Sequence, residues 1–171
     1  MQQRPLGRTG RNVSAIGLGT WQLGADWGQV SETEAEAVLA ASVASGVTLF
    51  DTADVYGDGR SETLIGRFMS SHDAYGVTVA TKMGRRMAQE PENYTPENFR
   101  AWTARSRENL GVDTLDLVQL HCPPTAVIED DATYEALDAL VADGAINAYG
   151  VSVETTAQAL AAIRRPREVV A

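Results

Sequence analysis

Cysteine and lysine are almost absent from this chain of 171 residues. Its single cysteine, Cys122, cannot form a disulfide within the chain, so we expect a reducing, cytoplasmic compartment. Lys82 is the only lysine among the 14 basic residues, and all the others are arginines. The protein environment can shift the pKa of a lysine ammonium, whereas an arginine guanidinium stays charged. Lys82 is therefore a candidate functional residue.

Positive charge and long apolar runs are also scarce. The formal net charge is −9, which argues against a nucleic-acid partner, because neutralising phosphates requires clustered Lys and Arg. No apolar run approaches the roughly 20 residues that span a bilayer, and no apolar segment follows the arginines of Met1–Gly10. We therefore expect neither a membrane partner nor a signal peptide. The length suits one domain that covers residues 1–171.

Short segments with strand character recur along the whole chain. Runs rich in β-branched and apolar residues predict strands at 13–18, 47–50, 77–80, 115–120 and 145–151, and the beginning of a sixth at 168–171. Helix signals separate them. Ser31 opens a capping-box pattern, and Ser61 is expected to cap the next helix. Thr95 precedes a proline suited to the first turn of a third helix, which Gly111 is expected to end.

This alternation implies parallel strands joined by right-handed crossovers, in either an open doubly wound sheet or a closed barrel. A dinucleotide-binding sheet should carry three glycines in the pattern G-x-G-x-x-G. Here Gly17 and Gly19 are present, but Gln22 stands where the third glycine should be. A TIM-type (β/α) barrel is therefore preferred. Complete barrels take about 250 residues, so we expect an incomplete one whose open edges favour self-association or coverage by another chain.

Three successive predicted strands have an ionisable residue at or just after their carboxyl ends. These residues are Asp51, Lys82 and His121, and Tyr56 lies in the loop that follows Asp51. In a barrel these ends meet at one rim, where a Lys–Asp pair could lower the pKa of the phenol. A neutral imidazole could hydrogen-bond a carbonyl oxygen. The set predicts proton transfer to a carbonyl group and needs a nicotinamide cofactor for hydride.

Five segments resemble, in order and spacing, signatures of the aldo-keto reductase superfamily. They are Gly17–Trp21, Phe50–Gly57, Thr81–Lys82, Leu120–His121 and Tyr149–Ser152. The resemblance covers essentially the whole chain and implies the N-terminal portion of an eight-stranded barrel that begins with a β-hairpin near Arg4–Gly10. It also implies reduction of an aldehyde or ketone to an alcohol, with NADP(H) as the hydride source.

The resemblance further implies individual roles. Tyr56 would donate the proton, Asp51 and Lys82 would tune the pKa of Tyr56, and His121 would orient the carbonyl group. The implied cofactor contacts are Gly19, Thr20, Trp21, Asp51 and Ser152, and the implied substrate contacts are Trp21, Tyr56 and His121. No metal is implied.

Two departures from the family pattern weaken the expected cofactor binding. Val153 stands where the family often has an asparagine after the serine that contacts the carboxamide. The family's residues for the pyrophosphate and the adenosine 2′-phosphate would lie beyond Ala171. We therefore expect these 171 residues alone to bind the anionic cofactor poorly.

Other functions remain open from the sequence. Lys82 at a barrel strand end also suits a lyase that forms a Schiff base with its substrate. A non-catalytic regulatory or assembly module on a reductase scaffold is a second alternative. Trp21, Trp27 and Tyr56 suggest an aromatic-lined pocket. His121 and Cys122 could suggest a metal pair, but further ligands at suitable spacing are lacking.

Overall fold

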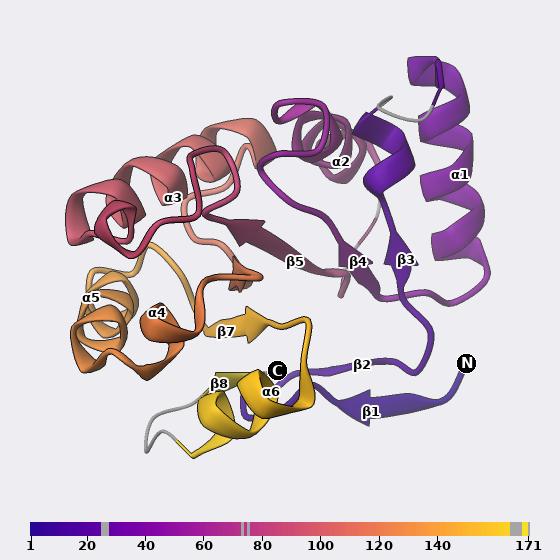
Figure 1. Ribbon diagram of the computed structural model, residues 1–171. Helices are drawn as coiled ribbons and strands as arrows, with labels where there is room; N and C mark the ends of the chain where they lie inside the picture. The colour runs from indigo at the N-terminus through magenta and orange to yellow at the C-terminus, as the bar shows by residue number, and fades with distance from the viewer. Residues whose placement is uncertain (25–27, 73, 75, 165–168, 171) are drawn as a thin grey trace.

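A single parallel sheet organises the chain (Figure 1). The computed structural model describes residues 1–24, 28–72, 74, 76–164 and 169–170. Its six parallel strands are paired in chain order: β3 (Leu18–Gly19), β4 (Leu49–Asp51), β5 (Thr78–Met83), β6 (Leu117–His121), β7 (Tyr149–Ser152) and β8 (Val169–Val170). Within the described ranges β3 and β8 do not pair with each other, so the barrel is incomplete, as expected.

Helices connect the strands. The α-helices are α1 (Glu32–Ala44), α2 (Arg60–Ser71), α3 (Pro96–Leu110), α4 (Thr125–Glu129), α5 (Asp131–Ala142) and α6 (Thr156–Ile163). Two short 3₁₀ turns, η1 (Trp21–Gly24) and η2 (Pro91–Asn93), precede α1 and α3. None of the described helices is long and apolar enough to cross a membrane.

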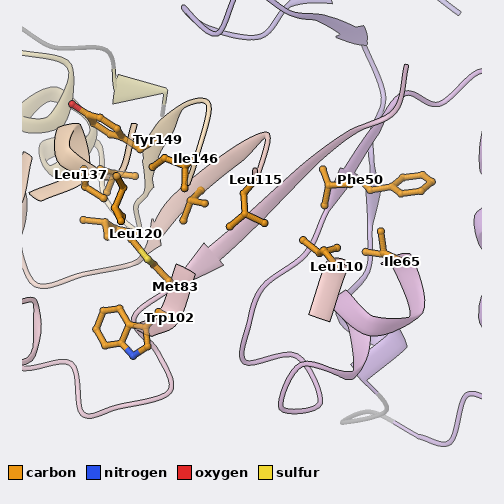
Figure 2. Close-up of a cluster of buried hydrophobic side chains, with 14 of the residues drawn as sticks. Phe50, Ile65, Met83, Trp102, Leu110, Leu115, Leu120, Leu137, Ile146 and Tyr149 are labelled. Carbon is orange, nitrogen blue, oxygen red and sulfur yellow. The ribbon is translucent and has the colours of Figure 1, made fainter. Parts of the chain in front are cut away.

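The helices cover one face of the sheet. Alternate strand residues, such as Phe50 and Leu120, pack with side chains from every α-helix in one large buried cluster (Figure 2). The opposite face carries a small cluster of Ala80 and Leu117, against which Leu6 of the N-terminal segment packs. A doubly wound sheet would have helices on both faces, whereas a barrel has them only outside. The structure therefore confirms the TIM-type arrangement.

The predicted first strand is two strands. Residues 12–14 form β2 (Asn12–Ser14), which pairs antiparallel with β1 (Gln3–Pro5), and only Leu18–Gly19 joins the parallel sheet. Ser14 explains the break, because its hydroxyl accepts a hydrogen bond from the Thr48 backbone N–H while its own N–H donates to the Thr48 hydroxyl, both at 2.8 Å. The β1–β2 pair is the expected N-terminal hairpin.

The assignment of Ser61 as a helix cap is wrong. Helix α2 begins at Arg60, the residue before Ser61, and its N-cap is Gly59 with a φ of 95°. Glycine suits position 59 because a φ of 95° lies in the left-handed region, which residues with a Cβ rarely adopt. Ser61 itself is fully buried and binds Thr20.

The other helix signals are confirmed. Ser31 caps α1 in a capping box, Thr95 caps α3, and Gly111 ends α3 in the left-handed conformation. Helix α4 was not predicted, because five residues are too few for a periodic apolar pattern. Of the predicted sixth strand, residues 169 and 170 pair with β7, while Glu168 and Ala171 lie outside the described residues. Trp27, which was expected to line an aromatic pocket, also lies outside them.

Candidate active site

Side chains at the carboxyl ends of four neighbouring strands point to the concave face of the sheet. Successive residues of a strand alternate between faces. Phe50, Met83, Leu120 and Val151 belong to the helix-covered core, so their strand neighbours Asp51, Lys82, His121 and Ser152 face inward. In the sheet register His121 pairs directly with Ser152. The parallel topology thus brings residues far apart in the sequence to one rim.

Lys82 is held at this rim by two oxygen atoms. Its Nζ donates to Oδ1 of Asp51 at 2.6 Å and to the backbone carbonyl oxygen of Thr52 at 2.9 Å. The side chain of Lys82 is 8% exposed and that of Asp51 is 45% exposed. The predicted Lys–Asp pair is therefore formed, with a nearly buried ammonium and a carboxylate that reaches solvent.

Tyr56 is carried to the same rim by the loop between β4 and α2. This loop continues the sheet pairing, since the N–H groups of Thr52 and Asp54 donate to the carbonyl oxygens of Ala80 and Lys82. Nζ of Lys82 lies 5.6 Å from the centroid of the Tyr56 ring. The next residue, Gly57, has a φ of 58°, and any Cβ there would collide with the backbone of Gly24. Glycine at this position permits the loop to fold against η1.

Three rings surround the mouth of the site. The Tyr56 and Trp21 rings stack with centroids 6.2 Å apart, and the His121 ring meets Tyr56 edge-on at 5.9 Å. With Val55 and Arg85 these residues line a cavity of about 330 Å³. Aromatic and apolar walls with a few polar groups are typical of small-molecule sites.

His121 is a buried imidazole at the end of β6. Burial lowers the pKa of His121 to about 4, and the nearby charges of Lys82 and Arg85 act in the same direction. The ring is therefore neutral at pH 7, as the sequence analysis assumed. Its Nδ1 atom is buried and has no hydrogen-bond partner among the described residues. A neutral imidazole can donate or accept through a ring nitrogen that reaches the cavity, which suits contact with a substrate oxygen.

The pKa of Tyr56 differs from the sequence expectation. Burial raises the pKa of the Tyr56 phenol above its ordinary value, the Asp51 carboxylate adds to the rise, and only Arg85 opposes it among the cations that act on this phenol. The expected lowering by Lys82 is wrong for this structure, because burial and the Asp51 carboxylate raise the pKa of the phenol instead. The phenol stays protonated at pH 7, which is the form that can donate a proton.

The residues expected to contact a cofactor are divided between surface and interior. Gly19 and Trp21 are exposed, and Ser152 is half-buried with its Oγ 3.7 Å from Sγ of Cys122. Thr20, by contrast, is buried, and its hydroxyl donates to the carbonyl oxygen of Asp51 at 2.8 Å. The Thr20 side chain thus joins two strand ends and is not presented to the open rim.

A hydroxyl network that the sequence analysis missed lies directly behind the rim. Ser61 on α2 binds Oγ1 of Thr20 at 2.9 Å, and Oγ1 of Thr52 donates to Ser61 at the same distance. All three side chains are buried. The network connects the ends of β3 and β4 to the first turn of α2, and so holds both the Asp51 backbone and the Thr52 carbonyl that binds Lys82.

Two buried carboxyl groups lie beside this network. Glu62 is fully buried and accepts hydrogen bonds from Thr81 at 2.5 Å and from Asn109 at 2.8 Å. Burial, and then the charge of Glu62, raise the pKa of Asp54 from 3.8 to about 7. A buried Glu at the third position of a helix gives no apolar-periodicity signal, so its contacts emerge only from the tertiary structure.

Arg85 and Val55 are cavity residues that the sequence analysis did not single out. Arg85 lies three residues after Lys82, in the loop that follows β5. The rule that strand-end loops carry the working residues of a barrel could have identified it. Its neighbour Arg86 has the same side chain, and nothing in the sequence distinguishes the two.

Comparisons with known proteins agree with this geometry. A sequence model of the aldo/keto reductase family matches residues 15–169. An uncharacterized oxidoreductase of Bacillus subtilis, YqkF, is 32% identical, and the match covers 89% of this chain and 49% of that protein. D-threo-aldose 1-dehydrogenase of a Pseudomonas species is 30% identical over 83% of this chain and 50% of its own length. The chain thus spans about half the length of these curated relatives.

Solved structures extend the similarity to three dimensions. A putative aldo-keto reductase from Pseudomonas aeruginosa superimposes with a TM-score of 0.82 at 32% identity, over 95% of this chain and 64% of that one. An aldo/keto reductase from Klebsiella pneumoniae, solved with NADP and acetate, has a TM-score of 0.73 at 30% identity, over 90% of this chain and 50% of its own. On the family match and this shared fold, the chain belongs to the aldo/keto reductase family.

Proposed function

We propose that this chain carries the proton-transfer site of an NADPH-dependent oxidoreductase that reduces an aldehyde or ketone to an alcohol. Tyr56 donates a proton to the carbonyl oxygen as it becomes an alkoxide. His121 hydrogen-bonds the same oxygen and orients the carbonyl group. Lys82 and Asp51 keep a charged pair beside the phenol, so that the phenolate left after proton transfer has a nearby ammonium.

The observation that carries the proposal is the position of Tyr56 between Lys82 and His121. The Tyr56 ring centroid is 5.6 Å from Nζ of Lys82 and 5.9 Å from the His121 ring. Together with the raised pKa of Tyr56 and the lowered pKa of His121, this supports a protonated phenol and a neutral imidazole side by side at pH 7. Both forms suit donation to a carbonyl oxygen.

The residues present fit the nicotinamide end of the cofactor. Ser152 offers a hydroxyl at the rim beside His121, and a Cβ on Gly19 would meet nothing within 4 Å, so the surface there is open to a flat ring. Trp21, which is 43% exposed, provides an aromatic wall. When bound, the cofactor supplies hydride to the carbonyl carbon. Ser152, Gly19 and Trp21 would hold it, and Asp51 pairs with Gly19 in the sheet register.

The contacts of Lys82 weigh against the Schiff-base alternative. A lysine that attacks a carbonyl needs a free, accessible amine. Here Nζ is engaged by Asp51 and Thr52, and Lys82 does not line the cavity. Borohydride in the presence of an aldehyde substrate should therefore trap no adduct on Lys82.

The test is an NADPH-oxidation assay of the purified chain with small aldehydes and ketones, accompanied by an NADPH titration. Tyr56→Phe should abolish reduction and leave the affinity for NADPH nearly unchanged, because its hydroxyl acts on the proton and not on the cofactor. Equal loss of both would assign Tyr56 a structural role. Saturable NADPH binding by the unmodified chain without turnover would favour the non-catalytic module.

A further inference from the structure

Arg85 brings a cation to the cavity beside Tyr56 and His121. It is an exposed residue in the loop after β5, and its side chain helps to line the cavity of about 330 Å³. In the part of the chain that the structure describes, Arg85 forms no hydrogen bond or ion pair. The adjacent Arg86, in contrast, binds Oδ1 of Asp58 at 2.8 Å. Of these two consecutive arginines, only Arg85 keeps its guanidinium available.

The charges around the cavity make Arg85 its dominant ion. Asp51 is compensated by Lys82 at 2.6 Å, and His121 is neutral at pH 7. The cavity therefore has a positive local charge in a chain whose net charge is −9. Because Arg85 lines the cavity and forms no ion pair among the described residues, its guanidinium is available there to a charged or polar group of a ligand.

The remaining walls show what kind of molecule would fit. Trp21, Val55 and Tyr56 offer apolar surface between the carbonyl-binding groups and the guanidinium. A guanidinium presents five N–H donors in a planar fork that matches carboxylate oxygens, and it also donates to hydroxyl oxygens. Because the apolar walls exclude water, such hydrogen bonds would be stronger in the cavity than in bulk solvent.

We propose that Arg85 determines substrate specificity by binding an oxygen-bearing group, either a carboxylate or hydroxyls, that the substrate carries away from its reacting carbonyl. This inference rests on the proposed function, because it assigns a second contact to the same substrate. Arg85 selects the substrate and takes no part in proton transfer. The cavity thus has a reacting end at Tyr56 and His121 and a recognition end at Arg85.

The test compares matched probes on the purified chain by isothermal titration calorimetry. 4-Formylbenzoate should bind about threefold to tenfold more tightly than its methyl ester, the range expected for a partly exposed charged hydrogen bond. Arg85→Met should bring this ratio close to one. Arg100→Met removes an exposed arginine of α3 outside the cavity and should keep the ratio.

A second pair of probes separates the two sources of oxygen. Glyceraldehyde against propanal tests hydroxyls without a charge. An Arg85-dependent gain in affinity for the oxygen-bearing probe of either pair supports the proposal. The pair that shows it identifies the bound group as a carboxylate or as hydroxyls. Equal affinities within both pairs, an unchanged ratio in Arg85→Met, or no binding of any probe would overturn it. Arg85-dependent binding without reduction, at an NADPH concentration that the titration shows to saturate the chain, would reject the proposed function and leave the recognition site in place.

Discussion

Lys82 and Asp51, on neighbouring strands, form the central ion pair of the site with an N–O distance of 2.6 Å. The two partners differ in exposure, since Lys82 has 8% of its side chain exposed and Asp51 has 45%. A nearly buried ammonium depends on its partner more than a solvated carboxylate does. We therefore expect that removing Asp51 alone, which leaves this ammonium without its carboxylate partner, destabilises the rim.

A double-mutant cycle should detect this coupling. Asp51→Asn, Lys82→Met and the double variant, compared by urea unfolding, should give an interaction free energy of about 1–2 kcal/mol. The exposed pair of Asp58 and Arg86 is the control, and its coupling should be weaker than that between Lys82 and Asp51. Equal interaction free energies in the two pairs would mean that burial at the rim does not strengthen the Lys82–Asp51 pair.

His121 should stay neutral well below pH 7. Burial lowers the pKa of His121 from 6.5 to about 4, so the imidazole protonates only near that pH. Because the folded-state pKa lies below the unfolded value, its contribution to stability is present above about pH 6.5 and is lost as the pH falls toward 4. The C2 proton of each histidine can be followed by NMR, with assignment by His121→Asn. A midpoint for His121 near its ordinary value would contradict the buried, neutral ring.

Asp54→Asn should remove a pH dependence of folding. The pKa of Asp54 is raised from 3.8 to about 7, so the folded state holds its proton where the unfolded state releases it. The resulting stabilisation is complete below about pH 4 and is lost as the pH rises through 7, at about 1.4 kcal/mol per unit.

Urea unfolding at pH 5 and pH 8 measures this effect. The stability of the variant relative to the unmodified chain should increase from the lower to the higher pH. Asp113→Asn, at an exposed position, is the control and should show no such trend. A parallel pH dependence for Asp54→Asn and the unmodified chain would show that Asp54 is ionised in the folded state.

Ser61→Ala should destabilise the chain by about 1–3 kcal/mol, because it leaves the buried hydroxyls of Thr52 and Thr20 without their shared partner. Ser70→Ala, on the exposed side of the same helix, should cost less than about 0.5 kcal/mol. Thermal unfolding of both variants provides the comparison. If the two substitutions cost the same, the hydroxyl network does not hold the strand ends together.

The 171-residue polypeptide should self-associate in solution. The described strands at the two ends of the sheet, β3 and β8, each have one unpaired edge, and α6 exposes Leu160 at 49% and Ile163 at 56%. Unpaired strand edges and exposed apolar side chains favour association. Sedimentation velocity should show species heavier than 18.3 kDa that increase with concentration. A monodisperse 18.3 kDa species at all concentrations would refute this prediction.

Local signals in the sequence were sufficient for the helices that have side-chain caps. Ser31, Thr95 and Gly111 act within a few residues of themselves, so their roles are written in the local sequence. Ser61 failed because the chain enters α2 through Gly59, whose φ of 95° favours glycine and leaves no side-chain cap. Ser61 instead bonds Thr20 and Thr52, and these contacts cannot be recognised from neighbouring residues alone.

By itself, the sequence determined the β/α order and the presence of an acid, an amine and an imidazole at successive strand ends. Strand alternation and the parallel topology then require that they meet at one rim. Only the tertiary structure decided how these groups are charged and which residues support them. The raised pKa of Tyr56, the neutral His121 and the unpaired Arg85 depend on burial and on distances between segments remote in the chain, which no local pattern encodes.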